Sequence, residues 1–260
     1  MIVLFCTVYK QFIKICLILF CIGMINISQI WALDITPFKP GEKLTYRIYW
    51  GYISAGYAVL QVLPFETIHG QTCYHFSLTA ETHVIIDPIY KVRDRIDAYS
   101  DIGMNHSLFY RKNVNEGRTH RVIQVVFDWT KKEAQYSNFG KAIPPISIFP
   151  KTFDPLSAFY YSRMINFMNT QSFSIPVTDG KKCIIGHARI VKQETIKVPY
   201  GKMNTFLLEP NIEHIGGVFE KSKHAKIQIW VTADQRKIPV RLKSKVIVGS
   251  FYADLVSIEF

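Results

Sequence analysis

Charged residues are most concentrated at residues 91–97 (KVRDRID), and Asp94 is the candidate among them for chemistry. If this segment is a strand, Asp94 shares a face with its apolar neighbours, while Arg95 lies on the other face. A carboxylate at the mouth of an apolar cavity could hold a ligand or act as a general acid or base. The alternative is a buried aspartate that needs a cation, which Arg163 or Arg241 could supply from elsewhere in the chain.

A second candidate group lies on a predicted helix at residues 154–168, which carries Tyr160 and Arg163. Asp154 is a good N-cap, and the proline that follows it is tolerated in the first turn, so both residues favour a helix start. Such a helix could cover a half-barrel and place Arg163 against an anionic head group. The alternative is an ordinary amphipathic helix that fills one end of a sheet.

Aromatic residues make up 14% of the chain, and some of them could line a groove for acyl chains or sugars. The candidates are Trp50, Tyr52, Tyr57, Trp129 and Trp230. Their large rings bury much apolar area, which suits either a ligand groove or the core of a sheet. The full set of predicted ligand-binding residues is Trp50, Asp94, Arg95, Tyr160, Arg163, Trp230 and Arg241.

The first 32 residues are typical of a secretory signal. Lys10 and Lys14 precede an apolar run at residues 15–25, and Ala32 is the best residue for the cleavage point. We therefore expect residues 1–32 to be a signal peptide and the mature chain to work in the periplasm. An uncleaved membrane anchor is the alternative, although a spanning helix needs about 20 apolar residues.

The chain is basic, with a formal net charge of +11, and its cations gather at residues 111–121, 221–226 and 236–245. Nucleic acid is the usual partner of such stretches, but export argues against nucleic acid here. The expected partner is a lipid or an acidic polysaccharide, with transient or peripheral association with a membrane. The alternative is a solvated strand face whose charges protect the sheet edge from aggregation.

Motifs for metal, nucleophile or phosphate chemistry do not occur in the sequence. The histidines show no HExxH or HxH spacing, and the cysteines show no zinc-ligand spacing. There is no GxSxG and no glycine-rich phosphate loop. We therefore predict no catalytic residue, no metal site and no cofactor. Beyond the export segment only Cys73 and Cys183 remain, as a disulfide or as two thiols.

Alternation of apolar and polar residues is the main signal for the fold. It recurs at residues 43–50, 73–80, 90–98, 122–129, 228–231, 240–248 and 252–260. Alternation of this kind predicts antiparallel strands with one packed face. Asp179-Gly180 predicts a tight hairpin, and Gly51 and Gly56 predict a bulge or sharp bend. We predict a mainly β protein: an antiparallel curved sheet or partly open barrel with one substantial α-helix.

Six segments follow one another in a recognisable order along the mature chain. They are PGEKLTYRIYWGYISAGYAVLQV, YKVRDRIDAYSD, DPLSAFYYSR, IPVTDGKK, VPYGKMNTFLLEP and IWVTADQRKIPVRLKSKVIVGSFYADL. Together they resemble a bacterial exported family, domain of unknown function 3108, over about residues 36–260. The resemblance implies an envelope location and a β-rich domain, and it implies no activity. We expect residues 33–260 to form a single β-rich envelope domain with a hinge near residues 143–153.

The predicted function is non-enzymatic binding of a hydrophobic or anionic amphipathic ligand in the cell envelope. A basic rim would hold the head group, and an aromatic interior would bury the tail. One alternative is an enzyme acting on envelope polysaccharide, with Asp94 and tyrosines such as Tyr160 as acid and base. Another is a structural partner in the envelope that pairs through an exposed sheet edge.

Overall fold

The computed structural model describes residues 36–211, 226–246 and 249–260. The chain divides into two compact units, Met1–Pro37 and Phe38–Phe260, and only the second is described along most of its length. The predicted signal peptide, residues 1–32, lies outside the described residues, as do residues 221–225 of the second basic stretch. The predicted domain boundaries therefore stay predictions.

The described part of the second unit consists of fifteen strands and one helix. The N-terminal strands are β1 (Lys43–Trp50), β2 (Ile53–Ile68), β3 (Gln71–Thr82), β4 (Arg93–Asp101), β5 (Ser107–Glu116), β6 (Thr119–Asp128), β7 (Glu133–Asn138), β8 (Lys141–Ala142) and β9 (Ile146–Ser147). The helix α2 (Pro155–Ser162) follows. The C-terminal strands are β10 (Ser172–Thr178), β11 (Cys183–Val198), β12 (Gly201–Asn211), β13 (Lys226–Thr232), β14 (Pro239–Val246) and β15 (Gly249–Glu259).

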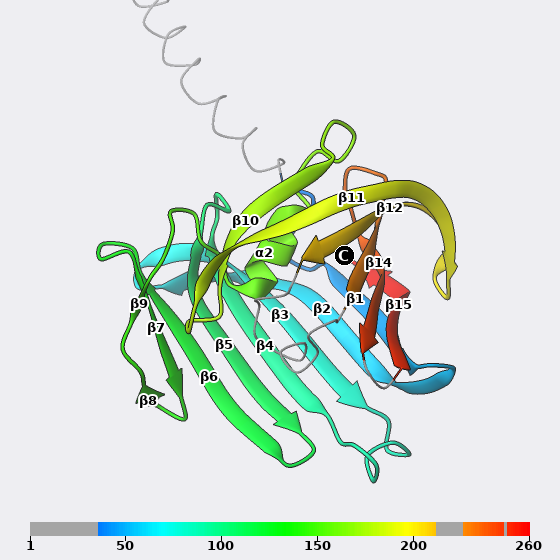
Figure 1. Ribbon diagram of the computed structural model, residues 1–260, viewed down its shortest axis with the longest axis horizontal. Coiled ribbons are helices and arrows are strands. Elements are labelled where there is room, and N and C mark those ends of the chain that lie inside the picture. The colour runs from blue at the N-terminus through cyan, green and yellow to red at the C-terminus, as the bar shows by residue number, and fades with distance from the viewer. Residues whose placement is uncertain (1–35, 212–225, 247–248) are drawn as a thin grey trace, which may run out of the picture. The chain divides into compact units, whose positions relative to one another are not determined.

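All fifteen strands belong to one antiparallel sheet, in the order β10-β11-β12-β13-β14-β15-β1-β2-β3-β4-β5-β6-β7-β8, with β9 paired to β7. Within the described residues the outer strands β10 and β8 do not pair with each other, so the sheet is not closed into a barrel. Figure 1 shows the sheet bending around α2. The prediction of a mainly antiparallel, curved β fold with one helix is confirmed.

Asp154 starts α2 as predicted, because its carboxylate accepts hydrogen bonds from the backbone N–H groups of Leu156 and Ser157. The helix ends at Ser162, so the prediction that it continues to residue 168 was wrong. Past the helix, the Asn166 side chain accepts a hydrogen bond from the backbone N–H of Met168. Such local bonds from polar side chains compete with the helical pattern.

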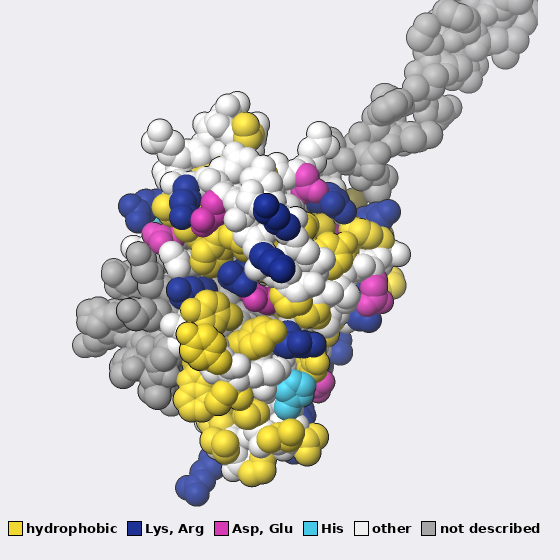
Figure 2. Space-filling model, turned by 90° about the vertical axis from the view of Figure 1, so that its right-hand side faces the viewer, with side chains coloured by type: hydrophobic (Ala, Val, Ile, Leu, Met, Phe, Trp, Pro, Cys, Tyr) yellow, Lys and Arg dark blue, Asp and Glu magenta, His cyan; other side chains and the backbone are white. Residues whose placement is uncertain are grey.

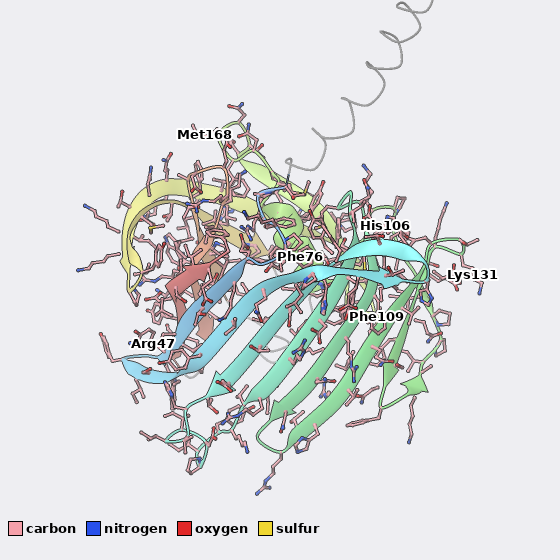
Figure 3. The ribbon with its side chains drawn as sticks, turned by 180° about the vertical axis from the view of Figure 1, so that it is seen from behind. Arg47, Phe76, His106, Phe109, Lys131 and Met168 are labelled. Carbon is pink, nitrogen blue, oxygen red and sulfur yellow. The ribbon has the colours of Figure 1, made fainter. Side chains whose placement is uncertain are left out.

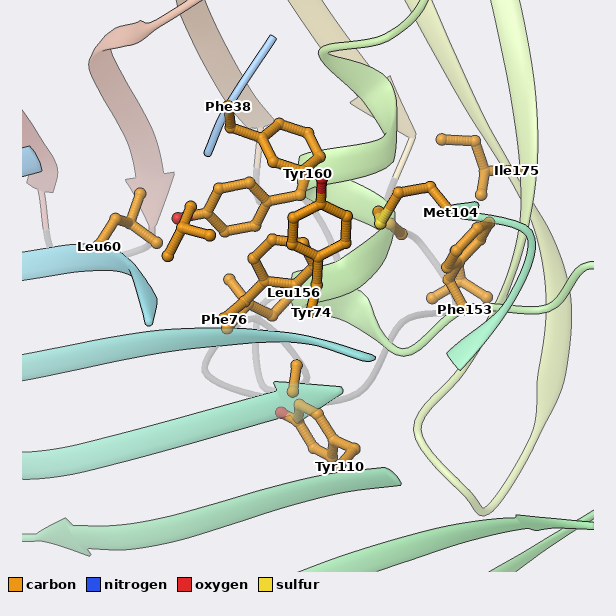
Figure 4. Packing of buried hydrophobic residues seen from close by; sticks show 14 of the residues in the cluster. Phe38, Leu60, Tyr74, Phe76, Met104, Tyr110, Phe153, Leu156, Tyr160 and Ile175 are labelled. Carbon is orange, nitrogen blue, oxygen red and sulfur yellow. The ribbon is translucent and has the colours of Figure 1, made fainter. Parts of the chain in front are cut away.

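Aromatic rings fill the space between α2 and the sheet (Figure 4). The Tyr160 ring stacks on Phe76 of β3 with centroids 4.0 Å apart, and Phe38 meets both rings edge-on. Tyr74 also stacks on Phe76, with centroids 5.5 Å apart. Offset and edge-on ring pairs of this kind contribute about 0.5–1.5 kcal/mol each beyond the area they bury. The interior beside α2 is therefore a packed aromatic core.

The predicted hairpin turn and the predicted bulge are both present. Asp179-Gly180 joins β10 to β11 as a hairpin, with Gly180 at a φ of +85°. A bulge interrupts the pairing of β1 with β2 after Ile48, which lies opposite Gly56. A Cβ atom on Gly56 would lie 2.0 Å from the Glu81 carbonyl oxygen, so β2 and β3 approach too closely there for any other residue.

The fourth strand starts later than the alternation at residues 90–98 predicts. Tyr90 lies in the loop before β4, where its backbone N–H bonds to the carbonyl oxygen of Ile86. The Ile86 N–H in turn bonds to the carbonyl oxygen of His83, so consecutive turns replace the strand. Pro88 supports this arrangement because it cannot donate a hydrogen bond to a strand ladder.

Candidate functional site

The face of the sheet that α2 covers can be followed from strand to strand by register. Phe76 of β3 contacts α2 and lies opposite Ala98 of β4, which lies opposite Tyr110 of β5. Directly opposed residues of an antiparallel pair lie on the same face, and residues two apart along a strand do so as well. We call this the helix-side face.

An apolar strip continues along the helix-side face beyond Phe76. On this face Leu78 lies opposite Ile96, and Lys112 of β5 separates Ile96 from Ile123 of β6. The helix packs mainly against β3, β4 and β10, and Figure 1 shows β3 to β6 extending well past it. We define the apolar strip as five partly buried side chains packed against the core: Ile48, Leu78, Ala80, Ile96 and Ile123.

A charged rim borders the apolar strip on the same face, formed by Asp94, Lys112, Glu116 and Arg121. The Asp94 carboxylate accepts a hydrogen bond of 2.8 Å from the backbone N–H of Asn115. Burial raises the pKa of the Glu116 carboxyl, and the nearby Asp94 raises this pKa further, whereas Lys112 and Arg121 lower it. The rim thus combines two close carboxyl groups with two cations.

Two of the predicted site residues lie on the helix-side face at this end of the sheet. One is Asp94 in the rim. The other is Trp50, two residues beyond Ile48 on β1, whose partly exposed ring stacks on Phe251 of β15 with centroids 6.3 Å apart. Arg95 lies on the opposite face, as its position next to Asp94 requires.

Tyr160 and Arg163 lie inside the core, away from the rim. The Arg163 guanidinium donates to both Glu42 carboxylate oxygens, at 2.6 and 2.9 Å, and to the backbone carbonyl oxygen of Arg236. Burial raises the pKa of the Tyr160 hydroxyl above its usual value. Arg163 therefore anchors the end of α2 through a buried ion pair with Glu42.

Trp230 and Arg241 also have partners within the protein. The Trp230 indole N–H donates to the Glu194 carboxylate at 2.9 Å, and the Arg241 guanidinium pairs with Asp254 at 2.7 Å. The alternative in which Arg163 or Arg241 neutralises Asp94 is not seen, since these arginines pair with Glu42 and Asp254. The seven predicted residues are thus spread over the rim, the end of β1, the opposite face, the core and the C-terminal strands.

A buried polar cluster on the opposite face was not predicted. His75 of β3 lies between two carboxylates, 2.7 Å from Glu66 and 3.0 Å from Asp97, and Arg95 also donates to Asp97 at 2.8 Å. Burial alone would raise the pKa of Asp97, but the hydrogen bonds from His75 and Arg95 outweigh burial and hold it well below its usual value. The His75 ring also stacks on Tyr99, and His75 and Asp97 are buried while the Glu66 and Arg95 side chains remain partly exposed.

A family model described as "Protein of unknown function (DUF3108)" matches residues 45–256. The chain belongs to the DUF3108 family. No curated protein matches this DUF3108 chain.

A solved structure resembles this DUF3108 protein in fold, and two others match over most of its length. A β-barrel-like protein of the DUF1849 family from Brucella abortus has a TM-score of 0.53 at 8% identity, over 85% of this chain and 97% of that one. A protein from Bacteroides fragilis described as exported, with a YmcC-like fold, has a TM-score of 0.35 at 12% identity, over 86% and 98%. A protein from Parabacteroides distasonis described as a lipoprotein has a TM-score of 0.34 at 14% identity, over 86% and 97%.

Both cysteines in the described part of this DUF3108 chain are free thiols. Cys73 is buried and donates to the Glu66 carbonyl oxygen, and Cys183 lies 3.5 Å from the Thr152 hydroxyl. Among the described residues no three His, Cys, Asp or Glu side chains are grouped so that they could hold a metal ion. In the same residues, no helix has the length and apolar character that crossing a bilayer requires.

Proposed function

We propose that this protein is a non-enzymatic component of the bacterial cell envelope that binds the tail of an anionic amphipathic ligand along the apolar strip. The observation that carries the proposal is the course of the strip, which runs along the helix-side face from the aromatic core to a charged rim. Each methylene group removed from water contributes about 0.8 kcal/mol, so an acyl chain lying on the strip gains substantial binding energy.

The rim suits the head group of such a ligand. Lys112 lies opposite both Ile96 and Ile123, so its ammonium group borders the strip directly. Arg121 lies two residues before Ile123 on the same face, at the edge of the same surface. A carboxylate or phosphate head group would meet these two cations while its tail covers the isoleucines.

The aromatic core between α2 and the sheet leaves no room for a ligand. Phe76 and Tyr160 stack at 4.0 Å, and both are fully buried. A tail that entered this region would have to displace packed rings, which costs several kcal/mol. The strip and not the interior around Tyr160 and Arg163 is therefore the proposed binding surface.

Binding of a dansyl-labelled fatty acid tests the proposal. Ala80→Trp fills the strip with a bulky ring, whereas Thr79→Trp places the same ring on the opposite face of the same strand. We expect Ala80→Trp to weaken binding by about tenfold or more, roughly 1.4 kcal/mol, and Thr79→Trp to change it by less than about twofold. Absence of saturable binding by the wild-type protein, or equal losses in both variants, would refute the proposal.

An enzyme acting on acidic polysaccharide is a second candidate, because Asp94 and Glu116 form a carboxyl pair in which Glu116 has a raised pKa. Glycoside hydrolysis by two carboxyl groups requires them about 5–10 Å apart, so that the sugar fits between them. Asp94 and Glu116 are close enough to interact by a direct hydrogen bond. Incubation with acidic polysaccharide should therefore release no new reducing ends, and release that Glu116→Gln abolishes would favour the enzyme.

Pairing with another envelope protein through a sheet edge has weaker support. The outer strand β10 is short and contains Pro176, which cannot donate to a neighbouring strand. The strands at the other edge, β8 and β9, have two residues each. Short edges and edge prolines are the usual means of preventing strand addition.

A further inference from the structure

Three turns and the start of β15 lie side by side at one end of the sheet. The β1–β2 turn bonds to β15 through the Gly51 N–H and the Ser250 carbonyl oxygen, at 3.0 Å. The β3–β4 loop bonds to β2 through His83 and Ala55, at 2.9 Å, and its Lys91 carbonyl oxygen accepts from Gly117 in the β5–β6 turn, at 2.8 Å. These bonds hold residues of four separate hairpins in one surface.

Large apolar side chains project from this surface into solvent. Ile85 is 86% exposed, Val84 79% and Ile89 72%. We define the tip surface by eight exposed side chains: Trp50, Tyr52, Ile53, Val84, Ile85, Ile89, Tyr90 and Phe251. Figure 2, which views the side of the sheet where the β1–β2 turn lies, shows hydrophobic side chains gathered over the lower part of this face. Isolated exposed apolar residues are ordinary, but a contiguous group of this size marks an interaction surface.

Hydrogen bonds order the β3–β4 loop, whose apolar side chains point outward. Arg93 donates two hydrogen bonds to the Asp87 carboxylate, at 2.7 and 3.1 Å, and Thr82 donates to the same carboxylate at 2.6 Å. His83 and Ile86 carbonyl oxygens close two consecutive turns within the loop. In the conformation that these bonds stabilise, Val84, Ile85 and Ile89 stay exposed to solvent.

The charge around the tip surface is positive. Residues 47–57, 82–94, 114–122 and 243–253 hold seven Lys and Arg residues against three Asp and Glu residues. Lys91, Arg118 and Arg121 are exposed, and Arg47 lies near the β1–β2 turn (Figure 3). A cation near an anionic lipid surface contributes about 1 kcal/mol, and Trp and Tyr prefer the level of the lipid head groups.

We infer that the tip surface docks on an anionic lipid bilayer, with Ile85, Ile89 and Trp50 among the head groups and the surrounding cations against lipid phosphates. The combination of exposed aliphatic residues, interfacial aromatic residues and a positive border fits this partner better than a protein, whose recognition would call for depletion of the lysines. The positive border shares Arg121 with the charged rim, but the apolar residues of the tip surface lie outside the apolar strip, so docking does not depend on the proposed ligand.

Co-sedimentation with vesicles tests the inference. Vesicles of phosphatidylglycerol mixed with phosphatidylcholine are compared with vesicles of phosphatidylcholine alone. The triple variant Val84→Ser, Ile85→Ser, Ile89→Ser removes the most exposed part of the tip surface. A matched control, Ile102→Ser, Met168→Ser, Ile185→Ser, removes three exposed apolar side chains from other parts of the chain. All proteins keep the same N-terminus, so its contribution to binding is equal throughout.

We expect the wild-type protein to bind the anionic vesicles more tightly, and the tip variant to lose about tenfold or more of this binding. The control should change by less than about twofold, and the melting temperatures of both variants should match the wild type because all six side chains are exposed. Equal vesicle binding by wild type and tip variant would overturn the inference. Equal binding to neutral and anionic vesicles would overturn it as well.

The docking and ligand proposals can fail separately. Ala80→Trp should keep vesicle binding while it loses the fatty acid, and the tip variant should keep the fatty acid while it loses the vesicles. Loss of both activities in either variant, with folding intact, would show that one surface serves both and would overturn the separate docking surface.

Discussion

Arg163 and Glu42 form a bidentate ion pair in the core, although they lie 121 positions apart in the sequence. Both side chains are about 1% exposed, and the guanidinium also donates to the backbone carbonyl oxygen of Arg236. The pair connects the C-terminal end of α2 to the residues just before β1 and to the turn before β14. It therefore fixes the helix, and with it the aromatic core, against the middle of the sheet.

Arg163→Met should destabilise the protein strongly. The substitution leaves the Glu42 carboxylate buried without its cation, and breaking a buried pair from one side costs about 3–5 kcal/mol. Urea unfolding followed by circular dichroism measures the loss.

Two further variants make this prediction specific. Glu42→Gln combined with Arg163→Met removes both charges and should recover a substantial part of the lost stability. Lys43→Met breaks the exposed pair with Glu259 and should change stability by less than about 1 kcal/mol. An Arg163→Met protein as stable as wild type would contradict the anchoring role of the pair.

Asp97→Asn should reduce stability in a pH-dependent manner. The folded protein holds the pKa of Asp97 well below its unfolded value of about 3.9, so the stabilisation is present above that pH and is lost as the pH falls through the folded pKa. At neutral pH the variant should be less stable by about 1–3 kcal/mol, as expected for hydrogen bonds to a charged group. Urea unfolding at several pH values should show the difference shrinking towards low pH, and a constant difference would count against the cluster.

Gly56→Ala should destabilise the pairing of β2 with β3. The added Cβ would lie 2.0 Å from the Glu81 carbonyl oxygen, a backbone atom that cannot move without disturbing the ladder. We expect a loss of about 1–3 kcal/mol by thermal or urea unfolding. Gly186→Ala is the matched control, because its Cβ would meet the nearest atom at 3.4 Å and it has no positive φ. Similar losses in the two variants would show that the close approach at Gly56 is not limiting.

Lys112→Glu should lower the affinity for the fatty acid and leave the stability of the fold unchanged. Lys112 borders the apolar strip, whereas Arg111 lies on the opposite face of the same strand, opposite Asp97. Charge reversal at Lys112 should lower affinity by about fivefold, the upper range for an exposed ion pair. Arg111→Glu should leave affinity unchanged in the same fluorescence titration, and an equal effect of both reversals would point to a nonspecific charge effect.

Local signals in the sequence were sufficient to predict strands, the helix start and a turn. They were not sufficient to predict which charged side chains meet across the strands. The alternation at residues 43–50, the N-cap Asp154 and the hairpin at Asp179-Gly180 depend on neighbours in the chain, and all three predictions are confirmed. The length of α2 was overestimated, because apolar spacing alone does not register the local hydrogen bonds of Asn166.

The partners of the charged residues depend on strand register, which one sequence does not specify. His75 meets Asp97 only because β3 and β4 pair with Ser77 opposite Asp97. Glu66 reaches His75 because the β2–β3 register shifts between Leu63 and Glu66. A signal for this cluster was present, since His75 lies on the polar face of its strand, but no rule of spacing connects it to a particular carboxylate.

Photo-crosslinking with a diazirine-bearing fatty acid, followed by mass spectrometry of the labelled peptides, tests the central claim most directly. We predict that labels concentrate on β3 and β4 at the strip residues Leu78, Ala80 and Ile96, and that unlabelled fatty acid competes them away. Labels confined to the loop at residues 83–92, labels on the opposite face around Thr79 and Arg95, or labelling that resists competition would contradict binding along the apolar strip.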